Sequence, residues 1–116
     1  MDFALSSEQE ALREAVGRIC SRFDDQYWLM RDREGGFPAE LHAALAEAGW
    51  LGIAIPEAYG GAGLGITEAA IMLQTIARSG AGMSGASAIH INIFGLNPVV
   101  VFGTEEQKQQ IGRAHV

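Results

Sequence analysis

The strongest constraint on the fold of this 116-residue chain is a stretch from Ser79 to Gly103 that contains no Asp, Glu, Lys or Arg. An uncharged stretch of that length is long enough to cross a lipid bilayer. However, His90, Asn97 and Pro98 interrupt it and glycines recur along it, a pattern that is unfavourable for a spanning helix. We therefore predict no membrane span, and expect two shorter pieces that pack against protein.

The first of these pieces has helical spacing, because one face of a helix ending near Gly95 would carry Ala86, Ile89, His90, Ile93 and Phe94. Asn97 and Pro98 then begin a second, shorter piece that ends at Gly103. The β-branched residues at 99–101 and the phenylalanine at 102 also favour a strand. The local sequence alone therefore leaves helix and strand open for 99–102.

A helix is predicted near the start of the chain. Ser6 or Ser7 precedes Gln9 or Glu10 by three residues, as a capping box requires. Apolar residues then recur at 3.6-residue spacing and form one helical face, made of Leu12, Val16, Ile19, Cys20 and Phe23. We expect this face to be core.

Two more helices are predicted from the same periodicity. One begins at Phe37–Pro38 and ends at Gly49, and its apolar stripe is Leu41, Ala44, Leu45 and Ala48. The other begins near Thr67, ends at the break in 79–82, and carries Ala69, Ala70, Leu73, Ile76 and Ala77, with Ile71 and Met72 on its other sides. Because this last helix is apolar on nearly every side, we expect it to be buried.

The connections are less regular. Residues 24–36 are polar and end in Gly-Gly, which predicts a connection with a frayed helical turn at 27–29. The apolar segment 50–56 is either a short strand or a buried turn, and 57–65 is a glycine-dense loop. Thr104 and Gln107 form another capping box, which predicts a last helix. These elements together predict an all-α fold, an orthogonal bundle of about five helices.

Composition excludes several classes of function. The chain has 14 acidic and 8 basic residues, with a net charge of −6, and Lys108 is its one lysine. This balance argues against a nucleic-acid or anionic-membrane surface. A single cysteine, Cys20, excludes an internal disulfide and a multi-cysteine metal site. Met1–Ser6 does not have the pattern of a secretory leader, so we expect a reducing, cytoplasmic location.

Catalytic and cofactor motifs are sparse. In the loop 57–65, Gly61 and Gly63 satisfy two positions of a dinucleotide fingerprint, but Ile66 occupies the third, and a structural turn is the favoured interpretation. Cys20 is expected in the core and His42 in solvent. We therefore predict no catalytic, cofactor-binding or metal-binding residue in this chain.

His90 is the polar side chain of most interest, because it shares an uncharged helical face with Ala86 and Phe94. A lone histidine in that setting is more often a hydrogen-bonded core residue than the wall of a pocket. Pocket lining remains the second interpretation of this residue.

Three stretches, in this order and spacing, resemble the amino-terminal domain of the acyl-CoA dehydrogenase family. They are Met1–Gln9 (MDFALSSEQ), Ile55–Gly63 (IPEAYGGAG), and His90–Lys108 with Pro98 and the segment GTEEQK. The resemblance covers residues 1–110. It implies an amino-terminal helical domain and favours helix at 99–102.

The resemblance also implies the activity of a longer parent protein. Members of the family use FAD: a glutamate removes the α proton of an acyl-CoA thioester while the flavin accepts hydride from the β carbon, in fatty-acid or amino-acid breakdown. Electrons usually pass to an electron-transferring flavoprotein, and the enzymes are commonly homo-oligomers. The glutamate and most flavin contacts belong to later domains, so the 116 residues alone are expected to be inactive and to bind no FAD.

The site residues that the resemblance implies for this chain are Ala86, Ser87, His90 and Phe94, which would face the distal part of the acyl group. His90 and Phe94 are bulky and would shorten or cap that pocket. The remaining residues, 111–116, depart from the family pattern, so the chain is expected to be truncated or to end in a shifted reading frame.

Two other functions stay open at this point. One is the same domain in an acyl-CoA oxidase or a flavin-dependent monooxygenase, and the other is a non-enzymatic helical interaction module. An interaction module predicts a polar, monomeric exterior. A dehydrogenase domain predicts a wide exposed apolar face, through which the isolated chain would self-associate.

Overall fold

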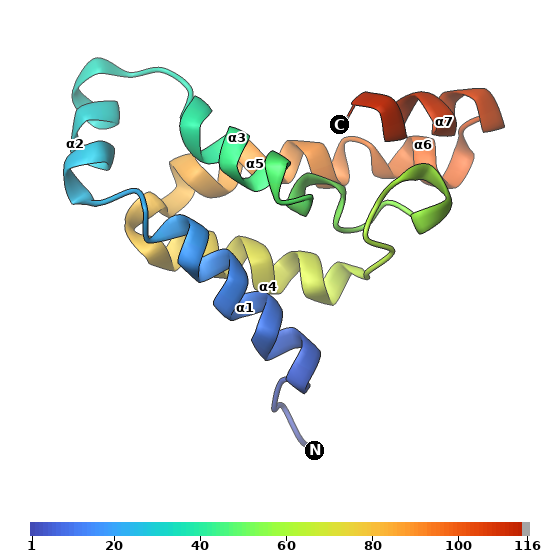
Figure 1. The fold of residues 1–116 in the computed structure, drawn as a ribbon, viewed down its shortest axis with the longest axis horizontal. Helices are drawn as coiled ribbons and strands as arrows, with labels where there is room; N and C mark the ends of the chain where they lie inside the picture. The colour runs from blue at the N-terminus through green and yellow to red at the C-terminus, as the bar shows by residue number, and fades with distance from the viewer. Residues whose placement is uncertain (115–116) are drawn as a thin grey trace.

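The computed structural model describes residues 1–114 and contains only helices and their connections in that range (Figure 1). The predicted all-α fold is therefore confirmed. The α-helices are α1 (Ser7–Cys20), α2 (Asp25–Glu34), α3 (Ala39–Glu47), α4 (Ile66–Ile76), α5 (Gly82–Phe94), α6 (Asn97–Phe102) and α7 (Glu105–Ala114). Two short 3-10 turns, η1 (Trp50–Gly52) and η2 (Glu57–Tyr59), and a π-helical turn, η3 (Ala77–Ala81), complete the chain.

The core forms where α1 crosses α4 and where α5 and α3 close over them (Figure 1). α1 buries the part of the predicted apolar face that lies within it, including Val16 and Cys20. Its predicted capping box is also present. Ser6 Oγ accepts from the Gln9 N–H at 3.1 Å, and Gln9 Oε1 accepts from the Ser6 N–H at 2.9 Å. The side chains that are almost fully buried are Val16, Cys20, Leu41, Leu45, Ile53, Met72, Ile76 and Ile89.

Residues 25–34 form a full helix, so the prediction of a connection with one frayed turn is wrong. The Asp24 carboxylate begins α2 by accepting from the Tyr27 N–H at 3.0 Å. The Tyr27 ring lies 5.0 Å from Phe23 and 4.9 Å from Trp28, between centroids, and the Tyr27 hydroxyl donates to Glu40 Oε2 of α3 at 2.7 Å. None of the residues of α2 is fully buried, which explains why the helix has no apolar periodicity in the sequence.

The apolar segment 50–56 is a buried turn and not a strand. Beyond it, the glycine-dense loop folds back on the turn, because the N–H groups of residues 61–64 donate to the carbonyl oxygens of Pro56, Gly52, Ile55 and Ile53 at 2.9–3.2 Å. Gly61 is required here, since a Cβ at this position would collide with the Ile55 carbonyl group. The loop is therefore a closed structural unit.

The uncharged stretch 79–103 is divided, as predicted, into a longer helix, α5, and a shorter one, α6. Gly80 (φ 97°) and Gly82 (φ 55°) reverse the chain, so that α4 and α5 run antiparallel and in contact (Figure 1). By length and composition alone, the run Ile66–Phe102 would qualify as a membrane-spanning helix. In the structure it is three helices, two of which pack against one another, and the absence of a membrane span stays a prediction.

The end of the described chain follows the sequence-based expectations. Residues 99–102 are helical in α6, as the family resemblance implied and against their strand propensity. The capping box of α7 is present: Thr104 Oγ1 accepts from the Gln107 N–H at 3.2 Å, and Gln107 Oε1 accepts from the Thr104 N–H at 2.9 Å. Of the predicted tail at 111–116, residues 115–116 lie outside the described part of the chain.

Candidate functional site

The four predicted site residues lie on α5, whose two sides have different surroundings. Gly85, Ile89 and Ile93 form the buried side, against the core. Since successive residues are about 100° apart around a helix, His90 and Phe94 lie on another side, away from the core. The side chain of Phe94 is 57% exposed, and His90 is half-buried.

His90 and Phe94 form a ring pair on this side of α5. Their centroids are 4.7 Å apart and the planes are inclined by 35°. His90 Nδ1 lies 3.0 Å from the carbonyl oxygen of Ser87. Because a carbonyl oxygen only accepts, Nδ1 carries a proton, and this hydrogen bond fixes the orientation of the imidazole ring.

The other two residues lie one turn earlier. Ala86 and Ser87 are both half-buried. Ser87 borders a separate cavity of about 490 Å³ between α5 and the start of α3, where it lies with Phe37 and Pro38. The structure therefore brings His90 and Phe94 together, links Ser87 to them through its carbonyl group, and directs the Ser87 side of the helix toward α3.

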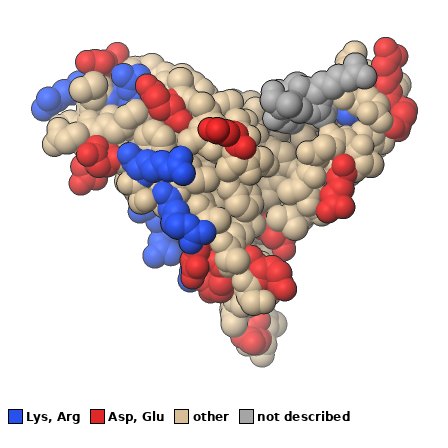
Figure 2. Space-filling model, viewed as in Figure 1, with Lys and Arg blue, Asp and Glu red and all other residues tan. Residues whose placement is uncertain are grey.

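Large apolar side chains are exposed on both α5 and α6. We call the exposed side chains of Met83, Phe94, Val101 and Phe102 the α5–α6 surface; Met83 is 76% and Phe102 is 86% exposed. In Figure 2, Lys and Arg gather mainly over α1 and α2, whereas Asp and Glu are spread over the visible face. Exposed apolar side chains on these two helices are what a dehydrogenase domain predicts, and the choice between that domain and a stand-alone module stays a prediction at this point.

The described residues offer little for catalysis by themselves. In the part of the chain that the structure describes, no three His, Cys, Asp or Glu side chains are grouped as a metal site would require. Cys20 is buried, and this burial raises the pKa of its thiol. A buried thiol with a raised pKa is a poor nucleophile, which agrees with the core role predicted for Cys20.

The glycine-dense loop does not fit the diphosphate of a flavin or a dinucleotide. A phosphate cradle needs backbone N–H groups that point outward. Here the N–H groups of Gly60 to Leu64 donate to carbonyl oxygens within 52–57, and the Gly65 N–H donates to Glu68 Oε2 at 3.1 Å. The structural turn predicted for this loop is therefore correct.

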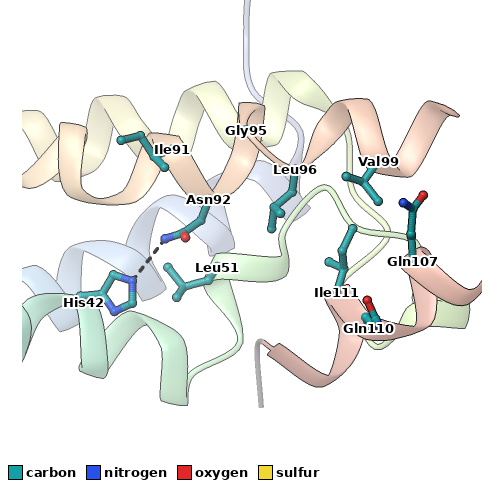
Figure 3. Close-up of a pocket in the computed structure, with 10 residues that line it drawn as sticks. All are labelled: His42, Leu51, Ile91, Asn92, Gly95, Leu96, Val99, Gln107, Gln110 and Ile111. Carbon is teal, nitrogen blue, oxygen red and sulfur yellow. Dashed lines mark hydrogen bonds between the residues drawn. The ribbon is translucent and has the colours of Figure 1, made fainter. Parts of the chain in front are cut away.

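A cleft of about 630 Å³ beside α5 was not predicted from the sequence (Figure 3). At one end, Asn92 Nδ2 lies 3.2 Å from His42 Nε2, which joins α5 to α3. The prediction that His42 is solvated is wrong, because this contact and the Phe37 ring, 5.3 Å away between centroids, hold it half-buried. The walls come from five separate elements, so no local motif could indicate the cavity.

Comparison with known families decides what the fold belongs to. The family described as "Acyl-CoA dehydrogenase, N-terminal domain" matches residues 6–114, nearly the whole chain. The chain belongs to the acyl-CoA dehydrogenase family. The resemblance noted in the sequence is thereby confirmed, and the fold described above is that of the amino-terminal domain of this family.

Similar curated proteins carry related names. The chain is 33% identical over 111 residues to the probable acyl-CoA dehydrogenase YngJ of Bacillus subtilis, a match that covers 94% of this chain and 28% of the relative. It is 32% identical over 110 residues to acyl-CoA dehydrogenase FadE12 of Mycobacterium tuberculosis, covering 93% and 27%. It is also 34% identical over 109 residues to an acryloyl-CoA reductase (NADH) of Anaerotignum propionicum, covering 94% and 27%. No solved structure matches the chain.

The chain therefore spans little more than a quarter of the length of these dehydrogenases. Membership of the family therefore identifies this chain as an amino-terminal domain. The activities named for the relatives are those of proteins several times longer. The roles of Ala86, Ser87, His90 and Phe94 accordingly stay predictions. What the structure adds to them is the contact between the His90 and Phe94 rings on the side of α5 that faces away from this domain's core.

Proposed function

We propose that this chain is the amino-terminal domain of a FAD-dependent acyl-CoA dehydrogenase, which introduces a double bond between the α and β carbons of an acyl-CoA thioester. Within that enzyme, α5 forms one wall of the acyl pocket through Ala86, Ser87, His90 and Phe94. The observation that carries this proposal is the α5–α6 surface, a set of large apolar side chains that a family domain leaves exposed. A surface of this kind marks a binding or packing site.

The ring pair sets the depth of the proposed pocket. The imidazole of His90 is oriented by the Ser87 carbonyl and packs against Phe94, so the two rings form a bulky block at the distal end of the acyl group. The two rings fill space that the terminal carbons of a longer chain would need. We infer that the parent enzyme favours short acyl groups.

The chemistry itself belongs to parts of the enzyme outside these residues. The closed glycine loop provides no cradle for the flavin diphosphate, and we assign the flavin and the glutamate base to the later domains. The 116 residues alone should therefore show no flavin absorbance and no thioester turnover. An electron-transferring flavoprotein as acceptor, a homo-oligomeric enzyme, and a cytoplasmic role in fatty-acid or amino-acid breakdown complete the proposal, and they rest on family resemblance.

A chimera tests the proposal. The segment of this chain that matches YngJ would replace the corresponding segment of YngJ, and the purified product would be assayed for bound flavin and for reduction of an artificial acceptor by acyl-CoA thioesters of increasing length. We expect bound flavin, acyl-CoA-dependent reduction, and a preference for short chains. Phe94→Ala should move that preference toward longer chains, because it removes half of the ring pair.

Phe3→Ala is the matched control, since Phe3 is equally aromatic, 84% exposed, and far from α5 in the sequence. It should leave the chain-length profile unchanged. A chain-length profile that Phe94→Ala also leaves unchanged would contradict the acyl-wall role. A flavin-loaded chimera that turns over no acyl-CoA would contradict the proposed activity.

A further inference from the structure

One hydrogen-bonding atom of His90 is left unused on the side of α5 that we propose as the acyl wall. Nδ1 of this histidine lies 3.0 Å from the carbonyl oxygen of Ser87, in the preceding turn of the same helix. Because a carbonyl oxygen only accepts, the proton is on Nδ1, and Nε2 of the neutral ring carries a lone pair that can accept. Within residues 1–111, whose side chains the structure describes, no group donates to Nε2.

The chemistry of the ring places this acceptor away from the helix backbone. Nδ1 is bonded to the ring carbon that joins the side chain to the main chain, whereas Nε2 is at the far edge of the ring. The ring packs against Phe94 with 4.7 Å between centroids, and neither His90 nor Phe94 belongs to the buried side of α5. Nε2 is therefore an acceptor at the outer edge of the ring pair, outside this domain's core.

The helix around the ring pair supplies no charged group that could serve a charged ligand. The stretch Ser79–Gly103, which includes all of α5 after its first turn and all of α6, contains no Asp, Glu, Lys or Arg. A carboxylate brought against the neutral ring would therefore meet a lone pair and no counter-ion on this wall, which is costly. The group that matches a neutral ring acceptor is an uncharged donor.

We propose that His90 Nε2 accepts a hydrogen bond from a hydroxyl group at the far end of the acyl chain, so that the parent enzyme prefers hydroxyacyl-CoA thioesters to alkyl ones of the same length. This inference rests on the proposed acyl wall and names the substrate class of that site. An alkyl end would cover Nε2 and leave it without a donor, and a site that bonds a substrate hydroxyl discriminates against the analogue that lacks it. His90 is thus a specificity-determining residue.

Nitrogen NMR of the histidine side chains tests the first step in the 116-residue chain, without any activity. The signals of His90 would be assigned by their loss in His90→Gln. We expect a proton on Nδ1 and none on Nε2 at neutral pH. A proton on Nε2 would overturn the proposal, because that atom would then be a donor.

Two thioesters of equal length test the second step in the YngJ chimera. In 5-hydroxypentanoyl-CoA a terminal hydroxyl replaces the terminal methyl group of hexanoyl-CoA, and we expect kcat/KM to be about tenfold higher for the hydroxyacyl thioester. Equal values, a preference for hexanoyl-CoA, or a preference for the carboxylate-ended glutaryl-CoA would overturn the proposal. A chimera that turns over none of these thioesters would instead contradict the proposed function on which the inference rests.

A pair of variants assigns the preference to one histidine. His90→Phe keeps an aromatic ring beside Phe94 and removes the acceptor, so the ratio of the two kcat/KM values should fall by about tenfold. His42→Phe is the same substitution at a histidine that contacts Asn92, roughly 200° around α5 from His90, and it should leave the ratio unchanged. A ratio that His90→Phe does not change, or that His42→Phe lowers equally, would overturn the proposal. If His90→Phe does not fold, the tautomer and the wild-type ratio still decide.

Discussion

Helices α4 and α5 lie antiparallel and in contact, and both are rich in apolar residues, yet they use those residues differently (Figure 1). α4 places Ile71, Met72 and Ile76 in the core. α5 buries Ile89 and Ile93 and leaves other large apolar side chains exposed. Ile66, at the start of α4, is also 75% exposed, but the rest of α4 has no large apolar side chain as exposed as Met83 or Phe94. Because exposed apolar surface has a free-energy cost in water, this difference is what the proposed function expects if the outer side of α5 meets a partner.

Two methionines test this difference between α4 and α5 most strongly. Met72 in α4 is fully buried, whereas Met83 in α5 is 76% exposed. Met72→Ala should lower the free energy of unfolding by about 2–5 kcal/mol, because it removes buried methylenes and leaves a cavity. Met83→Ala should change it by less than about 0.5 kcal/mol. Urea unfolding of the two variants measures both values, and equal losses would mean that α5 is as much a core helix as α4.

Gly85 tests how closely α5 approaches the core. A Cβ at this position would collide with the Ala81 side chain and would lie 3.2 Å from Ile76 Cγ2 and 3.4 Å from Leu41. Gly85→Ala should therefore destabilise the chain by about 1–3 kcal/mol, despite the better helix propensity of alanine. Gly17→Ala in α1 is the control, since its nearest contact is 3.9 Å away, and it should stabilise the chain by up to about 1 kcal/mol. Thermal unfolding distinguishes them, and a stabilising Gly85→Ala would contradict the close packing.

The exposed apolar side chains of α5 and α6 predict that the isolated chain self-associates. Phe102, on the α5–α6 surface, is 86% exposed, and burying it in a second copy would remove apolar area from water. Phe102→Ser should weaken association by about tenfold, while Phe3→Ser, at an exposed phenylalanine outside that surface, should have little effect. Light scattering across a concentration series measures both, and a monomeric wild-type chain at high concentration would contradict the prediction.

The smallest expected effect concerns the polar contact that holds α7 to η2. Tyr59 Oη donates to Glu105 Oε2 at 2.8 Å, and this hydrogen bond is the main reason that the pKa of the Glu105 carboxyl is lowered. A lowered folded-state pKa adds stability above the unfolded pKa, and this stability is lost as the pH falls through the folded value. Tyr59→Phe should therefore lower the Tm slightly at neutral pH and not in acid, because the contact is exposed.

Glu105→Gln provides the background for this measurement, since it removes the titrating group. In that background, Tyr59→Phe should change the Tm by the same amount at every pH. A pH-dependent difference that persists without the carboxyl group would show that another group is responsible.

The parts of the fold that were predictable have local signals that agree with their packing. α1 and α7 each begin with a capping box that is present in the structure, and α1 adds an apolar period that matches its buried side. α2 was missed because it buries none of its residues fully, so no apolar period marks it, and the Asp24 cap is its main local signal. The segment 50–56 was ambiguous because a buried turn and a buried strand have the same composition.

The candidate site also has one part that the sequence predicted and one part that it did not. Helical periodicity placed His90 and Phe94 on one side of α5, and the two rings do contact each other. The cleft on the other side of α5, and the pairing of His42 with Asn92, join residues 50 positions apart and depend on how α3, α5 and α7 pack. Tertiary packing of this kind leaves no pattern in a single sequence.

The central claim, that the outer side of α5 is covered in the complete protein, is tested most directly by cysteine labelling. Phe94→Cys would be labelled with a maleimide in the 116-residue chain and in the YngJ chimera lacking other accessible thiols; Cys20 is buried and gives little background. Glu47→Cys, at an exposed position of α3, serves as the reference. We predict rapid labelling at 94 in the isolated chain and strong protection in the chimera, while labelling at 47 changes little. Equal rates at 94 in both proteins would contradict the account.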